Sequence, residues 1–515
     1  RQTKESPIVR MNIHQSATPV LIVVVPLITS FILPLLGWGN RRLVFPVSLL
    51  ALLCSFGLSL ALAGRVLNVG PVEYFMGGWE PPWGIAFYVD HLAVLMLLLL
   101  TFVTLLVAIY SKKSILKEAP DQEVPFYSVY LILVSGLTGL VSTADMFNLY
   151  VFLEITSISC YALVSLGRGM AVVSAFRYVI LGTVGAAFYL LSVGYLYSVT
   201  GSLNMTDLAR ILPGLYESNA VLVGFAFFVI GISIKMALFP MHAWLPGAYS
   251  NAPSAVSALV AGTTTKVAAY VLARVMFFVF EPNFSVETLP VTTVLSWTAA
   301  VAMILGSVMA IVQSDLKRML AYSSIAQIGY IVLGIGLANG MGFTGGMLHL
   351  VNHAFMKCCL FLVAGAIVYQ TGRREIHTFR KLSRTMPLTT AAFTICAFGM
   401  IGLPPTGGFF SKVYLILGAI DQEQWVFVGV ILVSSVLAIG YLANVVRYMY
   451  LPADDDELAT ETTVSSHGEL ERENVPLTML VPMLILAAGV VLLGLFNGVV
   501  VSQFIDPAIP IGLLR

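Results

Sequence analysis

The chain has 515 residues, of which 58% are hydrophobic, and its mean hydropathy is +0.91. Only 10% of the residues are charged, whereas a soluble domain carries roughly 25%. No packed core could hide this much apolar surface from water, so the composition excludes a soluble globular protein and indicates a polytopic membrane protein. The net charge of +1 gives no basic domain of the kind that nucleic-acid binding requires.

Residues 1–17 are mostly polar, and residue 1 is not methionine. We expect an extension or a processed start, because this stretch lacks the apolar core of a secretory signal. About fourteen apolar segments of roughly 17–25 residues follow, which predicts an all-α protein with about 14 transmembrane helices. The predicted spans begin near Thr18, Leu43, His91, Phe126, Asn148, Val173, Val221, Ser254, Val291, Leu320, Thr344, Leu388, Trp425 and Pro476.

The loops that follow odd-numbered spans carry most of the lysine and arginine residues outside the spans. By the positive-inside rule these loops are cytoplasmic and both termini lie on the outer side. Glycine and proline are frequent in residues 66–90, which favours an outward turn or hairpin over a helix. Residues 452–475 form an acidic cytoplasmic loop, for which a solvated linker is favoured over a docking site.

Prolines interrupt two of the predicted spans. The seventh span runs into Phe239–Pro246, and the twelfth contains Gly402–Gly408. Proline removes a backbone donor, and the carbonyls that it frees must be satisfied inside the protein or in a watered cavity. Lys235 precedes the first break and Lys412 follows the second. The breaks are therefore expected to line functional cavities.

The two breaks are five spans apart, as expected for an internal repeat in a transporter. We expect one five-helix unit over 126–280 and a second over 291–450, in opposite orientations because each has an odd number of spans. Spans one to three with the outward loop would occupy 18–125, and the last span and C-terminus 476–515. Prolines that merely kink helices remain the alternative.

Four lysines and one carboxylate fall in or beside the apolar segments: Lys235, Lys266, Lys357, Lys412 and Glu154. A charged side chain at bilayer depth costs on the order of 3 kcal/mol, so such residues mark ion or proton pathways. A pair of Glu154 with Lys235 could switch protonation, although a static ion pair that fixes helix packing remains open. Three threonines precede Lys266 and could bond back to the helix and loosen it locally.

His349, His353 and Lys357 are spaced at i, i+4 and i+8, so they share one helix face. A proton relay is favoured because histidine titrates near neutral pH. Structural histidines and a metal site remain alternatives, but a third metal ligand is not evident. The proposed row of proton carriers is Glu154, Lys235, Lys266, His349, His353 and Lys412.

Other polar residues lie near the ends of the predicted spans. Arg177 and Arg274 indicate snorkelling or structural roles, because a long cationic side chain near a span end can reach the interface. Asp145 and Asn148 stand at the start of the fifth span, where helix caps are favoured over functional groups. These residues are therefore left out of the row.

The five cysteines all lie in apolar runs, and none forms a CxxC pair. Small buried hydrophobic residues are favoured over metal or iron–sulfur ligands, so we expect no cofactor on this chain. The cysteines are Cys54, Cys160, Cys358, Cys359 and Cys396.

The run Ser233–Pro246 strongly resembles the signature of the antiporter-like subunits found in respiratory complex I, membrane-bound hydrogenases and Mrp-type cation/proton antiporters. Asp315–Ser324, His349–Phe355 and Gly402–Pro405 support the resemblance, which covers about residues 15–500. It implies a fourteen-span fold with inverted repeats at spans four to eight and nine to thirteen. It further implies other membrane subunits as partners and a location in a prokaryotic inner membrane.

The resemblance also implies roles for the row. Glu154 and Lys235 would be the charge pair of one half-channel, and Lys266 the central relay. His349, His353 and Lys412 would form the other half-channel. Family members often have lysine where Arg177 stands, and an arginine does not deprotonate, so a relay role for Arg177 is not expected.

Length, Lys412 and runs such as Phe176–Tyr178 and Gly201–Asn204 favour the D-type subunit of an Mrp Na+/H+ antiporter over the other members. The chain would then be a transporter subunit rather than an enzyme. A proton-pumping subunit of a redox-driven complex I or hydrogenase assembly is the alternative, and a membrane scaffold for a soluble enzyme is a third. Only one intramembrane carboxylate is evident, which favours protons over Na+ as the ion carried by this chain.

Overall fold

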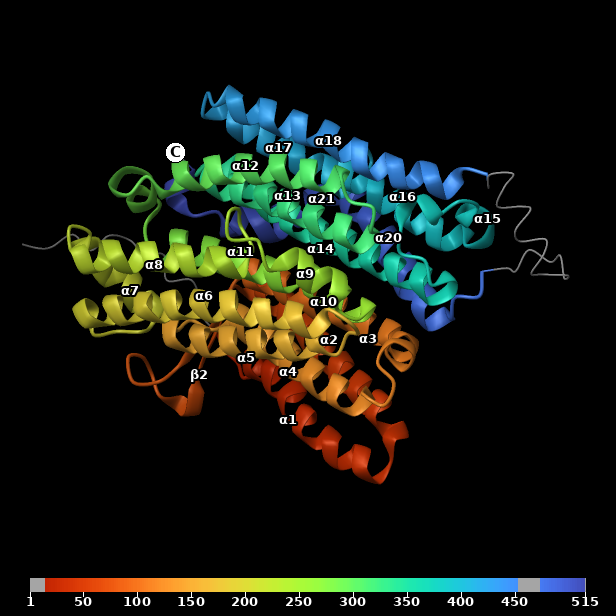
Figure 1. Ribbon diagram of the computed structural model, residues 1–515. Coiled ribbons are helices and arrows are strands. Elements are labelled where there is room, and N and C mark those ends of the chain that lie inside the picture. Colours follow the sequence, from red (N-terminus) through yellow and green to blue (C-terminus); the bar gives the residue numbers. More distant parts are fainter. Residues whose placement is uncertain (1–13, 453–472, 515) are drawn as a thin grey trace, which may run out of the picture.

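The computed structural model describes residues 14–452 and 473–514. Long apolar runs fold as helices that lie nearly parallel to one another (Figure 1). Among the described residues, twelve helices are long and apolar enough to cross a membrane. They are α1 (Thr18–Gly39), α2 (Val44–Val69, preceded by η1, Arg41–Leu43), α3 (His91–Glu118), α4 (Glu123–Ser142), α5 (Met146–Ser165), α6 (Ala171–Thr200), the continuous run α10 (Ser254–Gly262), α11 (Thr264–Arg274) and η4 (Val275–Val279), α12 (Val291–Ile311), α13 (Leu316–Gly336), α14 (Gly340–Thr371), α18 (Trp425–Tyr450) and α20 (Leu477–Leu495).

Both predicted breaks are present. The short apolar helix α8 (Asn219–Lys235) ends before the first break and α9 (Leu245–Asn251) follows it. The second break separates α16 (Pro387–Ile401) from α17 (Gly407–Asp421). The protein is therefore an all-α polytopic membrane protein. The fourteen predicted spans would be these twelve helices together with the two interrupted ones, α8 with α9 and α16 with α17, if each interrupted helix crosses the membrane once. That count remains a prediction.

The remaining elements are short and join the long helices. They are β1 (His14–Gln15), β2 (Val72–Phe75), η2 (Met76–Gly78), β3 (Ala86–Val89), α7 (Met205–Ile211), η3 (Leu212–Leu215), η5 (Phe284–Thr288), η6 (Ile376–Thr378), α15 (Leu382–Thr385), α21 (Asn497–Val500), η7 (Val501–Ile505), η8 (Asp506–Ala508) and η9 (Ile511–Leu513).

The loop between α2 and α3 is a β-hairpin, as expected, but it is shorter than 66–90. Strands β2 and β3 pair antiparallel with Val72 opposite Val89, and β1 adds a parallel strand to β2. The predicted start of the loop was wrong, because α2 continues through Val69 and ends only where Gly70 adopts a φ of 112°. The apolar side chain of Val66 is fully buried and keeps this last turn helical.

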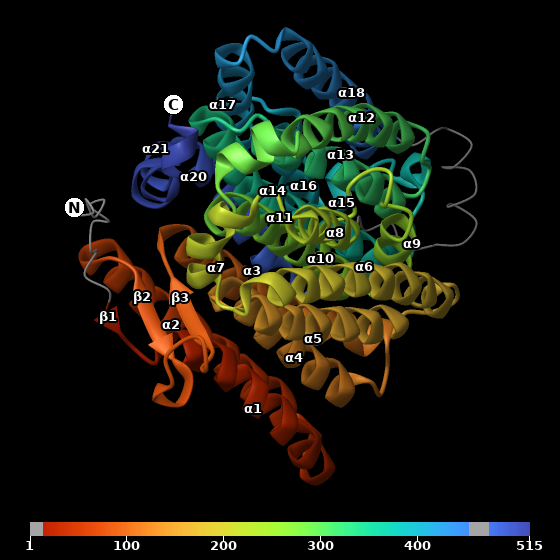
Figure 2. The same cartoon turned by 90° about the vertical axis from the view of Figure 1, so that its left-hand side faces the viewer.

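Seen from one end of the bundle, α10, α11 and α14 occupy the middle, and α1, α6 and α18 lie outside them (Figure 2). The central helices are almost completely buried, whereas only about a third of the residues in the apolar windows of α1, α2 and α18 are buried. In the middle of a bundle a buried charge has neither lipid headgroups nor bulk water within reach, so its partners must come from the protein.

A second pair of corresponding features lies five spans apart. Asp145 caps α5 by accepting from the Asn148 backbone at 2.7 Å, and Asp315 caps α13 by accepting from the Arg318 backbone at 2.9 Å. Each aspartate also forms an antiparallel bridge to the loop two spans later, Asp145 with Asn204 and Asp315 with Glu375. These paired features support the predicted five-helix repeat, which remains a prediction.

A buried ion pair closes the end of the bundle that carries the hairpin. Asp90 caps α3 by accepting from the Ala93 backbone at 2.9 Å, and its other oxygen lies 2.5 Å from Nη1 of Arg274 at the end of α11. Both side chains are about nine-tenths buried. Of the two roles open for Arg274, the structural one applies. Its partner Asp90 was not singled out in the sequence.

We expect Arg274→Met to lower the free energy of unfolding by about 3–5 kcal/mol, because it leaves the carboxylate of Asp90 buried without a counter-charge. Unfolding of the detergent-purified protein would measure the loss. Arg210→Met is the matched control, since the Arg210–Asp207 pair is exposed on the arginine side and should be worth at most about 1 kcal/mol. Equal losses in the two variants would contradict the prediction.

Candidate functional site

The first part of the predicted row is a lysine held at a helix end. Lys235 is the last residue of α8, and its Nζ lies 3.3 Å from Oε1 of Glu154 on α5. The same Nζ donates to Oγ of Ser157 at 2.8 Å. The Lys235 side chain is almost fully buried, whereas that of Glu154 is 26% exposed. The structure thus brings Glu154 and Lys235 into direct contact, although they are far apart in the sequence.

The break after Lys235 is closed by an aromatic residue. Trp244 donates from its indole nitrogen to the Ile234 carbonyl at 3.0 Å, and its ring stacks on that of Tyr178 with centroids 3.9 Å apart. The Ala237 backbone also donates to this carbonyl, at 3.1 Å, so the carbonyl at the end of α8 is satisfied from within the protein, as a helix break at membrane depth requires. This packing fixes the position of the last turn, and with it the position of Lys235.

A small internal cavity lies beside Lys235. Its volume is about 30 Å³, and its polar lining comes from Thr156, Ser157, Lys235 and Thr264. This is large enough for a water molecule, and the lining offers several polar partners. The buried hydroxyl of Thr156 has no hydrogen-bond partner in the part of the chain that the structure describes. The cavity extends from Lys235 to the first turn of α11, which carries Lys266.

Lys266 sits in the centre of the bundle, next to an interruption between α10 and α11. At Thr263 φ is −124°, and the hydroxyls of Thr263 and Thr264 donate to the carbonyls of Leu259 and Val260. The predicted back-bonding is thus confirmed. The Lys266 ammonium is fully buried and donates to the Ala261 carbonyl, just before the interruption, and to Oγ1 of Thr265 at 3.3 Å.

The two histidines of α14 differ in their surroundings. Nε2 of His349 lies 2.9 Å from Oε1 of Gln327 on α13, and Nδ1 lies 2.9 Å from Oγ of Ser411 on α17. Because an amide oxygen only accepts, Nε2 donates to Gln327, while the Ser411 hydroxyl lies within reach of both Nδ1 and the Gly408 carbonyl, at 2.9 and 3.1 Å. The His353 ring is 6.0 Å from that of His349, and neither of its buried nitrogens has a partner among the described residues.

Lys412 lies in the second turn of α17, and its side chain reaches back to the end of α16. Its Nζ donates to the carbonyls of Met400 and Ile401, the last two residues of α16, at 3.1 and 2.8 Å. It also donates to Oγ of Ser435 at 3.0 Å and lies 4.8 Å from the centre of the Tyr330 ring. The carbonyl end of a helix carries partial negative charge, so α16 stabilises the ammonium without a carboxylate.

Lys357, the third member of the α14 face, is fully buried and donates to the Leu320 carbonyl at 2.8 Å and to Oγ of Ser323. Leu320 lies one helical turn beyond Lys317, whose Nζ donates to the Ala252 carbonyl at 3.2 Å. Lys317 lines a cavity of about 270 Å³ at the last turn of α3, whereas the hairpin lies at the first turn of that helix. Lys357 therefore lies between this cavity and the histidines.

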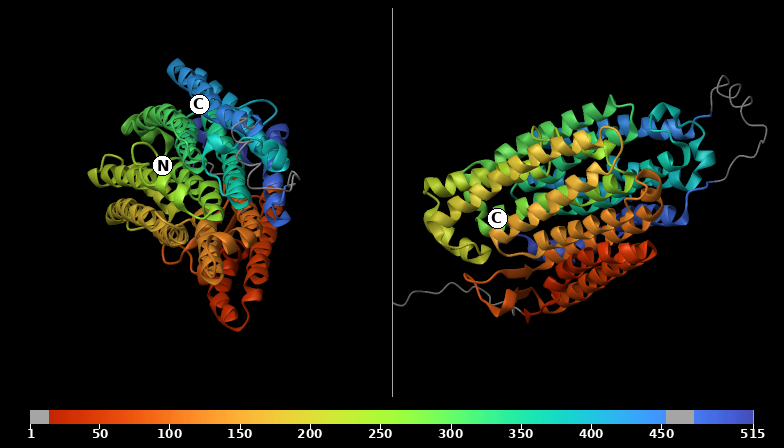
Figure 3. Two further views of the ribbon diagram at one scale, coloured as in Figure 1. Left: turned by 45° about the vertical axis from the view of Figure 1, so that its right-hand side comes forward. Right: turned by 60° about the horizontal axis from the view of Figure 1, so that its bottom comes forward.

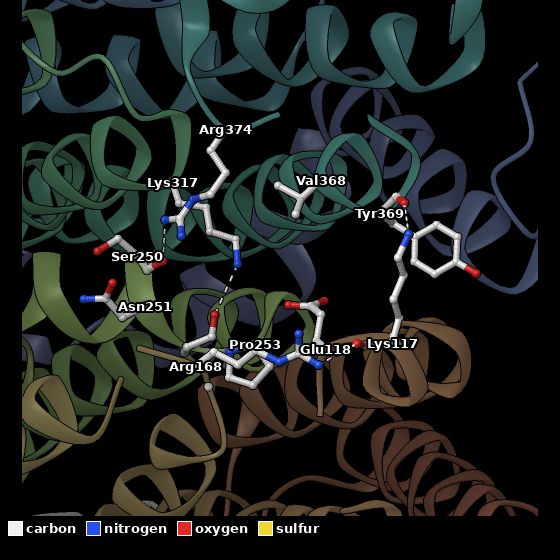
Figure 4. Close-up of a pocket in the computed structure, with 12 residues that line it drawn as sticks. Lys117, Glu118, Arg168, Ser250, Asn251, Pro253, Lys317, Val368, Tyr369 and Arg374 are labelled. Carbon is white, nitrogen blue, oxygen red and sulfur yellow. Dashed lines mark hydrogen bonds between the residues drawn. The ribbon is translucent and has the colours of Figure 1, made fainter. Parts of the chain in front are cut away.

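Charged side chains from four elements surround that cavity, and one of them is Lys317 of α13 (Figure 4). Lys117 and Glu118 come from the end of α3, Arg168 from the loop after α5, and Arg374 from the loop after α14. Glu118 accepts from the backbone and hydroxyl of Ser254 at 2.8 and 3.1 Å, so it anchors the first turn of α10. Of the lysines that are buried, Lys317 lines this cavity directly, between charged side chains and apolar surface.

The row is not one unbroken chain of hydrogen bonds. Glu154 contacts Lys235, and His349 reaches Ser411, the neighbour of Lys412. Direct hydrogen bonds between Lys235 and Lys266, or between Lys266 and His353, are absent from the described residues. Sequence reasoning missed the partners Ser157, Gln327, Ser411 and Ser435. Of these, only Gln327 could have been recognised from the sequence, because an amide side chain is unusual in an apolar span. The three serines could not, because serine is common in membrane helices.

The structure bears on two alternatives, a metal site at the histidines and a relay role for Arg177. Both ring nitrogens of His349 already make hydrogen bonds, and the described residues contain no group of three side chains that could hold a metal ion. Arg177 is exposed on the surface of α6 and has no carboxylate partner within the described ranges, unlike the paired Arg274. The described geometry therefore places Arg177 outside the buried row.

Comparison with known proteins identifies relatives over nearly the whole chain. Residues 143–438 match the family model described as NADH:quinone oxidoreductase/Mrp antiporter, TM, and residues 82–113 match that of NADH-ubiquinone oxidoreductase (complex I), chain 5 N-terminus. The N-type subunit of the NADH-quinone oxidoreductase of Desulforudis audaxviator is 45% identical over 96% of this chain and 98% of its own length. The D-type subunit of the Na(+)/H(+) antiporter of Alkalihalophilus pseudofirmus is 30% identical over 95% of this chain and 98% of its own.

Solved structures show the same relationship. A chain of the membrane-bound sulfane sulfur reductase, an archaeal respiratory membrane complex, has a TM-score of 0.86 and 29% identity, covering 97% of this chain and 98% of that one. A chain of the Mrp complex from Dietzia sp. has a TM-score of 0.84 and 25% identity, covering 95% and 97%. The chain therefore belongs to the family of antiporter-like membrane subunits that NADH:quinone oxidoreductases and Mrp antiporters share.

Proposed function

We propose that this protein translocates protons through Glu154, Lys235, Lys266, His349, His353 and Lys412, as one subunit of a multisubunit membrane assembly. The observation that carries the proposal is the set of partners around the buried lysines. Apart from Glu154, the partners described for Lys235, Lys266 and Lys412 are backbone carbonyls and serine or threonine hydroxyls.

Neutral partners suit a proton carrier for an electrostatic reason. When a lysine that is paired with a carboxylate loses its proton, it leaves a buried anion without a counter-charge, which is costly. When Lys266 or Lys412 loses a proton, the groups that accept its hydrogen bonds are neutral dipoles. Lys235 differs because Glu154 stabilises its charged form, so a change in the distance between them would shift its protonation. The cavity beside Lys235 would let water carry a proton toward Lys266.

The parent assembly has two candidates. The sequence favours an Mrp-type Na+/H+ antiporter with this chain as its D-type subunit. The 45% identity to an N-type subunit of a NADH-quinone oxidoreductase, against 30% to a D-type antiporter subunit, supports a redox-driven proton pump in which other subunits carry the redox groups. In both candidates this chain carries protons, and Na+ passage through it has no support from an evident carboxylate cage.

We expect Lys235→Ala and Glu154→Ala each to reduce proton transport by about 10²-fold or more, because each removes half of the charge pair. Proton movement in inverted membrane vesicles that hold the complete assembly would measure this. Arg177→Gln is the control, since it removes an exposed charge on the neighbouring helix and should leave transport near wild type. Normal transport in both alanine variants would refute the proposed role of the pair.

Lys412→Arg separates a proton carrier from a structural cation. Arginine keeps the positive charge and the donors toward the end of α16, but it does not deprotonate in proteins. We therefore expect assembled protein with nearly unchanged thermal stability and strongly reduced transport, about 10²-fold or more. Transport at the wild-type level would show that Lys412 serves only as a fixed charge.

The driving force distinguishes the two assemblies. In inverted vesicles without any reductant, added Na+ should collapse a pH gradient if the assembly is an antiporter, and Lys235→Ala should abolish this response. If the assembly is redox-driven, Na+ should have no effect and proton pumping should begin only when NADH or another reductant is added. Whichever of the two responses the wild type shows, its loss in Lys235→Ala would support proton transport by this chain.

A further inference from the structure

A groove outside the proton pathway lies at the edge of the bundle. Helices α1 and α2 form this edge, as both views in Figure 3 show. The groove has a volume of about 840 Å³ and lies where η1 and the first turns of α2 meet the end of α3 and the start of α4. Its lining is apolar along α2 and cationic at the mouth, so two kinds of surface meet in it.

The apolar part follows one face of α2. Phe45, Leu49 and Leu53 are spaced at i, i+4 and i+8 and extend over about 12 Å of the helix. Leu50 is 60% exposed, Leu53 48%, and Leu116 on α3 45%. These side chains form an exposed apolar wall on the outer face of the bundle. Its length matches the part of an acyl chain nearest to the headgroup.

The mouth carries an excess of positive charge. Arg41, Arg42 and Lys112 line it, against one carboxylate, Glu123. Arg41 lies 3.3 Å from Asp121 in an exposed pair. The described residues provide no carboxylate within ion-pair distance of Arg42 or Lys112, and Nζ of Lys112 lies 4.7 Å from the centre of the Phe45 ring. The ammonium is thus held at the boundary between the charged mouth and the apolar wall.

The backbone adds to this field. The turn η1 runs directly into α2, and Asn40 caps it by accepting from the Arg42 backbone at 3.0 Å. No acidic residue lies in the first turn of η1 or of α2, so no carboxylate there offsets the partial positive charge of the helix start. The loop follows the first predicted span, which the positive-inside rule assigns to the cytoplasmic side. Anionic lipids are concentrated in that leaflet, and each nearby lysine or arginine attracts them.

We propose that this groove binds an anionic glycerophospholipid, with its phosphate between Arg42 and Lys112 and an acyl chain along Leu49, Leu50 and Leu53. A free phosphate would not use the apolar wall, and a zwitterionic lipid would not need the excess of cations. The inference is independent of the proposed function, because none of these residues belongs to the proton row.

The test uses the full chain in its assembly, delipidated in detergent and then reconstituted with phosphatidylglycerol and phosphatidylcholine in equal amounts. Retained lipid is counted by mass spectrometry after repurification. We expect the wild type to retain phosphatidylglycerol, and Arg42→Gln/Lys112→Gln to lower its apparent affinity by about tenfold or more, as expected for two membrane-surface cations. Lys113→Gln is the matched control, because Lys113 is exposed beside Lys112 but does not line the groove.

A second variant, Leu53→Trp, fills the apolar wall and keeps every charge, so it should also reduce retention of phosphatidylglycerol. Unchanged retention in both variants would overturn the proposal. Displacement by millimolar inorganic phosphate would overturn it as well, because the site would then bind the anion alone. Cross-linking of a cysteine at position 50 (Leu50→Cys) to another subunit, in place of a lipid, would identify the groove as a subunit interface and equally refute it.

Discussion

Backbone carbonyls at helix ends hold two of the buried ammonium groups of this protein, those of Lys266 and Lys412, and the placement of these two lysines depends on them. Lys412 is bonded to the last two carbonyls of α16, and Lys266 to a carbonyl just before the interruption at Thr263. A continuous helix would use these carbonyls for its own hydrogen bonds. The breaks thus convert backbone that must be satisfied at membrane depth into binding sites for a positive charge.

The protein contains two kinds of buried charge, and the difference between them matters for function. Arg274 and Asp90 form a fixed pair of permanent opposite charges that joins two helices. The lysines of the row are surrounded mainly by neutral dipoles, which tolerate both the charged and the neutral form. Their position also differs, since the row runs through the centre of the bundle and the fixed pair closes one end of it.

The two ends of the bundle and its edge differ in the surfaces that they present. The cavity around Glu118 and Lys317 lies at one end, while the hairpin and the Asp90 pair lie at the other end. Helices α1 and α2 form an apolar edge of the bundle (Figure 3), and none of the residues of the row lies on them. Membrane contacts at that edge can therefore be changed by mutation without touching the residues proposed to carry protons.

The sequence by itself determined the features that depend on neighbours along the chain. Apolar run length predicted the helices, proline predicted both breaks, and the aspartate before α5 was expected to cap it, because these effects act within a few residues. The three threonines before Lys266 likewise predicted the local loosening of the helix.

Only the tertiary structure decided which distant side chains meet. His349 and Ser411 are 62 residues apart, and Arg274 and Asp90 are 184 apart. Serine, glutamine and aspartate occur at many positions with no local pattern that names their partners, so Ser411, Ser435, Gln327 and Asp90 could not be assigned from the sequence. Their pairing follows from the packing of whole helices, which brings together residues that no periodicity along the chain connects.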